Sequence, residues 1–262
     1  MSLELLDNPL INATLFYPRR AEPGGNPRAG VSDGTIPVSD SVHLGYRLFA
    51  ASDTALPLVL LFHGNGEIAP DYDDIAPLYH RAGASLLVVD FRGYGWSSGQ
   101  PSAPALLADV DSAYEALPGL LEKAGLTGEL FVMGRSLGSA PAIHLVHEYA
   151  DTFAGLILES GFAHILPLMA RLGLPTERLA GLPDPVGNIR KLAEIDLPLL
   201  VIHGERDNIL PVANGQALYD ASPALQKRIL RVPRAGHNDL LFYAPDEYFA
   251  AIADFIQEVL AT

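Results

Sequence analysis

The chain has 262 residues, of which 49% are hydrophobic and 18% are charged. This apolar share is enough to build a sizeable core and excludes a generally disordered chain. The formal net charge of −14 makes nucleic acids and anionic membrane surfaces poor partners, because association would begin against like-charge repulsion. The lack of cysteine in the sequence excludes disulfides, thiolate metal sites and a cysteine nucleophile.

The first residues contain no basic cluster followed by an apolar run, so we expect no secretory signal peptide and a cytoplasmic protein. The most apolar stretches, such as 56–62 and 197–202, are too short to span a bilayer. We therefore expect neither a membrane anchor nor a nucleic-acid partner. The sequence leaves the oligomeric state open.

Residues 19–34 are rich in Gly, Pro, Asn and Asp, a composition typical of an irregular surface loop. The next segment, 36–49, is predicted to form two short strands that pair as a hairpin at one edge of a sheet. Short apolar runs then alternate with stretches of helical period. These runs predict strands at 58–62, 85–90, 130–133, 155–158, 199–202 and 228–232.

Two segments, 106–121 and 249–259, have apolar residues at three- and four-residue spacing, which is typical of a helix with one buried face. Strands that are apolar on both faces belong in a buried parallel sheet. Their alternation with helices predicts a doubly wound α/β fold, in which one domain over 1–262 has a mostly parallel sheet flanked by helices.

The interval 161–196 breaks this alternation, because it is long, dotted with proline, rich in leucine and without a clear strand. Long connections in compact domains often act as lids. We expect a small helical cap inserted into the domain, and a long helix with a plain connection is the alternative.

The pentapeptide Gly134-Arg135-Ser136-Leu137-Gly138 stands between an expected strand and an expected helix over 137–149. This is the position of a G-x-S-x-G nucleophile elbow. Its tight turn leaves no room for side chains at the two glycines and exposes Ser136 at the carboxyl edge of the sheet. The backbone amide of Leu137, at the start of the helix, would then face a developing oxyanion.

Three further motifs follow expected strands: His63-Gly64-Asn65-Gly66, the segment 91–97, and Gly236-His237-Asn238-Asp239. Together with the elbow, they make residues 36–260 resemble the α/β-hydrolase family, in its serine esterase and thioesterase-like branch. The resemblance implies that the backbone amides of Asn65 and Leu137 form the oxyanion hole. It also implies that His63 is a structural residue that holds its loop.

A serine nucleophile needs an imidazole to take its proton and a carboxylate to orient that imidazole. In this family of motifs the chain order is serine, acid, histidine. Asp207 and His237 each follow an expected strand, and His237 is the only histidine after Asp207. Glu159 is the alternative acid, but we expect it to be a hydrogen-bonded residue beneath the site.

Metal and nucleotide sites have weaker support in the sequence. The acidic run 71–74 suits the first turn of a helix. His144 and His147 are three residues apart, and we predict no third metal ligand on their segment. We therefore expect both to lie on an ordinary helix surface. The glycines at 93 and 95 lack the third glycine of a dinucleotide loop, because Ser98 stands in its place. We expect no metal and no cofactor.

The nucleophile elbow, the histidine, the acid and the oxyanion-hole amides predict hydrolysis of a carboxylic ester or thioester of a small molecule through an acyl-Ser136 intermediate. The same catalytic residues would also support the activity of a peptidase or an acyltransferase. A catalytically silent binding module is a further alternative, because fold does not fix function. The sequence names neither the acyl chain nor the leaving group.

Overall fold

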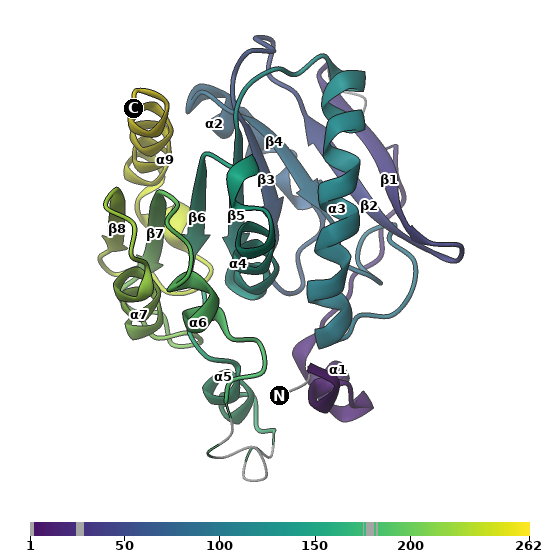
Figure 1. The fold of residues 1–262 in the computed structure, drawn as a ribbon, viewed down its shortest axis with the longest axis vertical. Helices are drawn as coiled ribbons and strands as arrows, with labels where there is room; N and C mark the ends of the chain where they lie inside the picture. The colour runs from purple at the N-terminus through teal and green to yellow at the C-terminus, as the bar shows by residue number, and fades with distance from the viewer. Residues whose placement is uncertain (1–2, 25–28, 175, 177–180, 182) are drawn as a thin grey trace.

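The structure is a computed structural model that describes residues 3–24, 29–174, 176, 181 and 183–262. Within these residues, eight strands form one sheet in the order β1-β2-β4-β3-β5-β6-β7-β8 (Figure 1). The strands are β1 (Val31–Ser39), β2 (Val42–Phe49), β3 (Leu58–Phe62), β4 (Ser85–Val89), β5 (Leu130–Arg135), β6 (Gly155–Glu159), β7 (Leu199–Gly204) and β8 (Lys227–Val232). β2 is antiparallel to both β1 and β4, and every other pair is parallel. The predicted mostly parallel sheet is confirmed.

The six strands predicted after residue 57 differ from the observed ones by at most two residues at either end. The edge hairpin differs more, because β1 begins at Val31, inside the segment predicted as an irregular loop. An edge strand can form from such a polar sequence because β2 supplies its backbone partners, beginning with Val31 opposite Phe49. Residues 25–28 of the predicted loop lie outside the described part of the chain.

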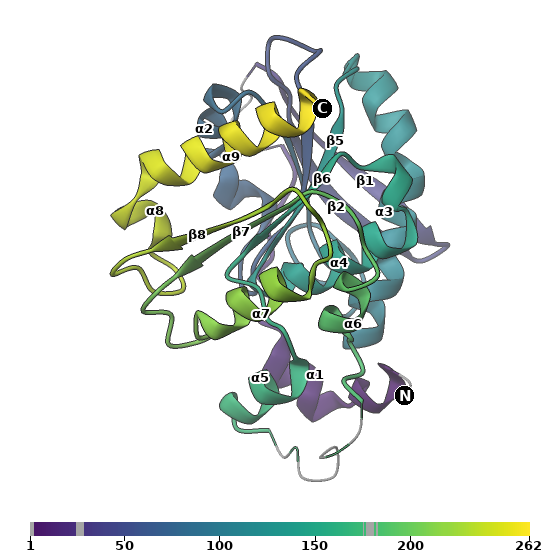
Figure 2. The same cartoon turned by 60° about the vertical axis from the view of Figure 1, so that its left-hand side comes forward.

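Helices cover both faces of the sheet (Figure 2). One face carries α2 (Ala76–Arg81), α8 (Leu240–Tyr243) and α9 (Pro245–Leu260), and the other carries α3 (Ala103–Ala124), α4 (Ser139–Glu148), α6 (Asn188–Leu192) and α7 (Ala213–Ala221). Short 3₁₀ helices lie at η1 (Leu3–Leu6), η2 (Ala69–Tyr72), η3 (Ser136–Gly138) and η4 (Ala150–Thr152). Successive strand residues point to opposite faces, so Leu60 of β3 joins the core under α3 while Leu61 joins the core under α9.

The two long predicted helices are present with the predicted faces buried. Leu106, Val110 and Leu117 of α3 lie in one core, and Ile252 and Ile256 of α9 lie in the other. α3 begins where Ser102 accepts a hydrogen bond from the amide of Ala105 and ends at Gly125, which has a φ of +68°. The helix predicted at 137–149 starts as η3, and Pro141 is the third residue of α4. Proline is tolerated in this first turn, because its missing N–H has no helical acceptor there.

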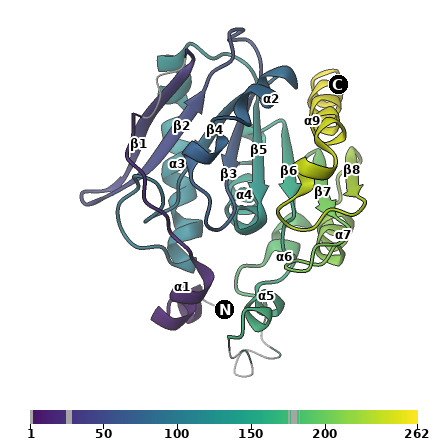
Figure 3. The ribbon, with the colours of Figure 1, turned by 180° about the vertical axis from the view of Figure 1, so that it is seen from behind.

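α1 (Pro9–Leu15) and α5 (Ile165–Arg171) lie at the end of the molecule to which the arrowheads of the parallel strands point (Figures 1 and 3). The described part of 161–196, the predicted cap, holds α5 and α6 and no strand. Residues 175, 177–180 and 182 of that interval are outside the described part, so the cap stays a prediction. No helix of the described residues is long and apolar enough to cross a bilayer.

Candidate active site

The turn between β5 and α4 has the strained geometry that a nucleophile elbow requires. Ser136 has a φ of +50°, a conformation that non-glycine residues rarely adopt. A Cβ built on Gly134 would collide with the carbonyl oxygen of Gly138, and one on Gly138 would collide with that of Phe62. The two glycines therefore allow α4 to pack directly against the ends of β3 and β5.

The structure brings Ser136, His237 and Asp207 into one hydrogen-bonded line. The Oγ atom of Ser136 lies 2.8 Å from Nε2 of His237, and Nδ1 of His237 lies 2.6 Å from Oδ2 of Asp207. All three residues are buried, with 9%, 7% and 5% of their surface exposed. Each follows the carboxyl end of a parallel strand, namely β5, β8 and β7.

Close packing of two loops brings Asp207 to His237. A Cβ on Gly204 would lie 2.5 Å from the carbonyl oxygens of Ala235 and Gly236. The amide of Arg206 donates a 2.8 Å hydrogen bond to the oxygen of Ala235. The loops after β7 and β8 are thus joined by their backbones, as their adjacent positions in the sheet predict.

The carboxylate of Asp207 has more partners than the sequence indicated. Its Oδ1 accepts hydrogen bonds from the amides of Ile209 and Leu210, at 2.9 Å and 2.7 Å. Its Oδ2 also lies 3.3 Å from Nε2 of the fully buried His203. Burial by itself raises the pKa of the Asp207 carboxyl, but the hydrogen bonds from His203 and His237 outweigh burial and hold that pKa well below its ordinary value. Asp207 is therefore a fixed anion.

Sequence reasoning missed His203, although its position offered a signal. It is the first residue of the segment His-Gly-Glu-Arg-Asp, directly after the apolar part of β7. Its Nε2 also lies 2.7 Å from the carbonyl oxygen of Leu210, so it ties both ends of the Asp207 loop together.

Arg135, the second residue of the elbow motif, joins four segments around the site. Its guanidinium forms ion pairs with Glu67 and with Glu159, the latter at 3.0 Å. The same group donates to the carbonyl oxygen of His237 at 3.3 Å and to Oδ1 of Asn238 at 3.0 Å. Arg135 thus links the loop after β3, the end of β6 and the histidine loop.

Glu159, the alternative acid, is held by partners other than His237. One of its oxygens accepts from Nε of Arg135 at 3.0 Å, and the other accepts from the hydroxyl of Tyr248 at 2.7 Å. Its side chain is only 8% exposed. The geometry therefore matches the role beneath the site that the sequence predicted for it.

We expect Arg135→Met to lower the free energy of unfolding by about 3 kcal/mol at neutral pH, because it leaves two largely buried carboxylates without their cation. Burial raises the pKa of Glu67, but Arg135 leads the interactions that hold it below the ordinary value of 4.5. The pair therefore stabilises the protein above about pH 4.5, and this stabilisation is lost as the pH falls. Urea unfolding should show a smaller difference in the free energy of unfolding between the variant and the wild type at pH 4 than at pH 7.

The matched control for this change is Arg228→Met. Arg228 pairs with Glu258, and both side chains are more than 40% exposed. Exposed pairs contribute at most about 1 kcal/mol. Equal losses in the two variants, or a difference for Arg135→Met that does not depend on pH, would contradict the role given to the buried network.

The side chain of Asn65 is occupied by the N-terminal segment. Its Oδ1 accepts from the amide of Tyr17 at 2.9 Å and from the hydroxyl of Tyr94 at 2.6 Å, and its Nδ2 donates to the oxygen of Leu15 at 2.7 Å. These contacts engage both polar atoms of the Asn65 amide. The side chain thus secures the chain that follows α1, a function that the sequence did not indicate.

A cavity of about 230 Å³ opens beside Ser136. The polar residues that line it are Tyr17, Asn65, Arg135, Ser136, His237 and Asn238, and Leu137 lines it as well. The rest of its lining is aliphatic: Leu15, Leu168, Leu172, Ile209 and Leu210. Three separate segments, namely α1, α5 and the loop after β7, supply these walls, so the cavity is a product of the tertiary fold.

His63 lies in the core beneath the loop that carries Asn65. It is fully buried, its Nδ1 lies 2.8 Å from the carbonyl oxygen of Gly64, and its Nε2 lies 3.2 Å from Asp90. Of the acidic run 71–74, Asp71 pairs with Arg19 and Asp73 pairs with Arg47. These side chains therefore have structural partners.

Comparisons with known proteins identify the family. The family model described as Serine aminopeptidase, S33 matches residues 54–186, about half of the chain. Alpha/beta hydrolase domain-containing protein 17C of Mus musculus is 32% identical over 224 residues, which cover 83% of this chain and 65% of that protein. The Xenopus tropicalis protein of the same name is also 32% identical, and the match covers 83% of this chain and 67% of it. The chain thus spans about two thirds of the length of the curated relatives it matches.

Solved structures show the same fold at lower identity. The Pyrococcus furiosus esterase Pf2001 aligns with a TM-score of 0.70 and 20% identity, over 92% of this chain and 98% of that one. Est1E of Butyrivibrio proteoclasticus, solved with ferulic acid bound, aligns with a TM-score of 0.69 and 19% identity, over 87% of this chain and 100% of that one. The family model, the relatives and the fold lead to one conclusion: the chain belongs to the α/β-hydrolase family.

Proposed function

We propose that the protein is a serine hydrolase that cleaves carboxylic esters or thioesters through an acyl-Ser136 intermediate. The single observation that carries the proposal is the continuous line from Ser136 Oγ through His237 to Asp207, with separations of 2.8 Å and 2.6 Å. Membership of a hydrolase family supports an enzyme, and the strained backbone of Ser136 supports a functional role for that residue.

In the first half-reaction, Nε2 of His237 takes the proton of Ser136 as the Oγ atom attacks the carbonyl carbon of the substrate. Asp207, held as an anion, stabilises the imidazolium and keeps Nδ1 protonated. The oxygen of the tetrahedral intermediate carries a negative charge, and the backbone amides of Asn65 and Leu137 are the proposed donors to it. His237 then donates its proton to the leaving alkoxide or thiolate, and the acyl group remains on Ser136.

In the second half-reaction, His237 takes a proton from a water molecule that attacks the acyl carbon. The collapse of the second tetrahedral intermediate returns that proton to Ser136 and releases a carboxylic acid. None of these steps requires a metal or a cofactor.

The aliphatic walls of the cavity favour an apolar acyl or alcohol group over a peptide backbone, because they offer few partners for amide groups. The described part of 161–196 contributes Leu168 and Leu172 to these walls. We infer that the interval forms a small cap over the site, because α5, in its described part, lies at the carboxyl ends of the strands.

A panel of p-nitrophenyl esters and acyl thioesters of graded chain length tests this proposal. We expect turnover that rises with chain length until the acyl group fills the cavity and then falls. Turnover of aminoacyl amides in preference to esters would favour the peptidase alternative, which the name of the matching family model also raises. A folded protein that binds acyl compounds without turnover would favour the binding module.

We expect Asn65→Ala to raise KM for an apolar ester about tenfold while kcat falls less than tenfold. The change releases the chain at Leu15 and Tyr17 but leaves the backbone amide in place. Loss of an oxyanion donor, in contrast, lowers kcat by about 10²- to 10³-fold. Steady-state kinetics separate the two outcomes.

Tyr94→Phe is the matched control, because it leaves two of the three hydrogen bonds to Asn65 and removes only the contacts of the Tyr94 hydroxyl with Asn65 and with the amide of Tyr17. We expect a smaller rise of KM in the same direction. If Asn65→Ala instead lowered kcat as far as the loss of an oxyanion donor does, the oxyanion contact would belong to the side chain and this interpretation would be rejected.

A further inference from the structure

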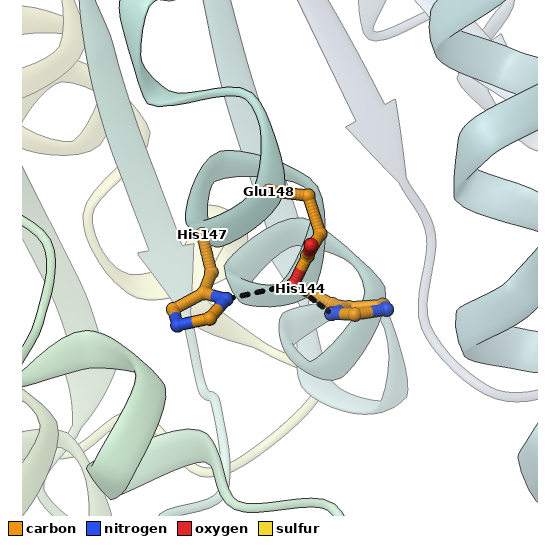
Figure 4. A group of neighbouring side chains, drawn as sticks. All are labelled: His144, His147 and Glu148. Atoms are coloured by element: carbon orange, nitrogen blue, oxygen red, sulfur yellow. Dashed lines mark hydrogen bonds and ion pairs between the residues drawn. The ribbon is translucent and has the colours of Figure 1, made fainter.

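Two histidines and a glutamate meet on the C-terminal half of α4 (Figure 4). His144, His147 and Glu148 each offer one ligand atom, and these three atoms lie within 4.8 Å of one another. Residues three and four positions apart share one face of a helix, so the backbone of α4 fixes the grouping. The proposed catalytic mechanism uses none of these side chains.

Glu148 is the shared partner of the two imidazoles. Its Oε1 lies 2.8 Å from Nδ1 of His147 and 3.7 Å from Nδ1 of His144, too far for a hydrogen bond to the latter. The Nδ1 atom of His144 is shielded from solvent and makes no hydrogen bond within the described residues. A shielded polar atom without a partner is uncommon, because its desolvation is not compensated. A metal ion between the three residues would provide that partner.

The outer nitrogen of His147 has the contact expected of a metal ligand. Its Nε2 lies 2.9 Å from Oε2 of Glu194, which follows α6. A ligating histidine usually donates its other N–H to a carboxylate, which fixes the tautomer and directs the remaining lone pair at the metal. With Nε2 engaged by Glu194, the Nδ1 atom of His147 is the one that faces Glu148, where a metal ion would lie.

We propose that His144, His147 and Glu148 bind one zinc ion, with Glu194 fixing His147 from outside and a water in the fourth position. Two imidazoles and one carboxylate are a donor set that zinc accepts in tetrahedral sites. Calcium and magnesium prefer oxygen ligands alone. The site lies in the C-terminal half of α4, whereas Ser136 precedes the first turn of that helix. It joins α4 to the segment after α6. We therefore expect zinc to stabilise the fold and not to take part in the reaction at Ser136.

A positive charge on α6 opposes the ion. Lys191 of α6 lies near enough to interact electrostatically with both His144 and Glu148. Repulsion between its ammonium group and a divalent cation weakens binding. Lys191→Met should therefore bind zinc more tightly than the wild type. This gain of affinity is a readout that a misfolded variant cannot imitate.

Titration of the metal-free full chain with zinc chloride, against a competing chromophoric chelator, tests the proposal. We expect one zinc per chain in the wild type and none in the double variant H144A/H147A. Glu194→Gln should weaken binding by about 10- to 100-fold, as loss of an outer partner does. Zinc should also raise the thermal midpoint of the wild type and leave that of the double variant unchanged.

Two controls exclude other histidines. His237→Ala removes the possibility of zinc on the His237–Asp207 pair and should still bind one equivalent. His164→Ala removes a side chain that is 52% exposed and should bind as the wild type does. In a crystal grown with zinc, the anomalous peak should lie between the three α4 side chains. Equal binding by H144A/H147A and the wild type, failure of the wild type to take zinc from the chelator, or a peak elsewhere would overturn the site.

Discussion

Ser136→Ala should abolish covalent labelling by a fluorophosphonate and lower kcat for an ester by about 10⁶-fold, the loss seen when the serine of a protease triad is removed. Only a serine whose proton is taken by a neighbouring base attacks this electrophile readily, and Ser136 lies 2.8 Å from Nε2 of His237. Intact-mass measurement of the labelled wild type should show one adduct, and peptide mapping should place it on Ser136.

Ser160 provides a matched control within the same chain. It is fully buried, and like Ser136 it has a positive φ, here +46°. Its Oγ atom makes no hydrogen bond within the described residues. Ser160→Ala should therefore keep both labelling and turnover. Labelling of a folded Ser136→Ala variant would remove Ser136 as nucleophile, and a wild type that is never labelled would favour the silent binding module.

Asp207→Asn should lower kcat by about 10⁴-fold, and the structure supplies the reason. The amides of Ile209 and Leu210 both donate to Oδ1, so the amide oxygen of an asparagine would remain there. Its NH₂ group would then face Nδ1 of His237. An NH₂ group in that place donates to Nδ1 and stabilises the imidazole tautomer that cannot accept the serine proton, as happens in serine proteases with the same substitution.

Glu159→Gln separates the two candidate acids. Glu159 contacts Arg135 and Tyr248, so we expect a loss of only about tenfold, typical of a supporting residue. Rates for both variants should be measured with the same ester, together with the thermal midpoint. An inactive Glu159→Gln beside an active and folded Asp207→Asn would require Glu159 to be the acid.

His203 also stabilises the ionised form of Asp207. Its Nε2 lies 3.3 Å from the same oxygen that faces His237, and it contributes to the lowered pKa of the Asp207 carboxyl. The anion therefore has support besides His237. The catalytic role that we propose for Asp207 uses this support, because a carboxylate that stays ionised keeps His237 in one tautomer across the working pH range.

The sequence by itself determined the six strands from β3 to β8, the two long helices and the order of the proposed catalytic residues. These features are encoded locally: strand runs such as 58–62 are apolar without interruption, and α3 repeats apolar residues at helical spacing. The elbow is local as well, since Gly134 and Gly138 are the residues that its close packing requires. Chain order and strand ends were sufficient to select Asp207 and His237.

Only the tertiary structure decided which side chains complete the site. Arg135 meets Glu67 across 68 positions of sequence, and Asn65 meets Leu15 across 50. The sequence separations of such pairs match neither helical nor strand periodicity, so no pattern in the sequence predicts these contacts. The same reason explains why the partner of His147 at Glu194, 47 positions away, was not predicted. Periodicity reports which face of an element is buried, whereas the packing of distant loops determines which polar groups meet there.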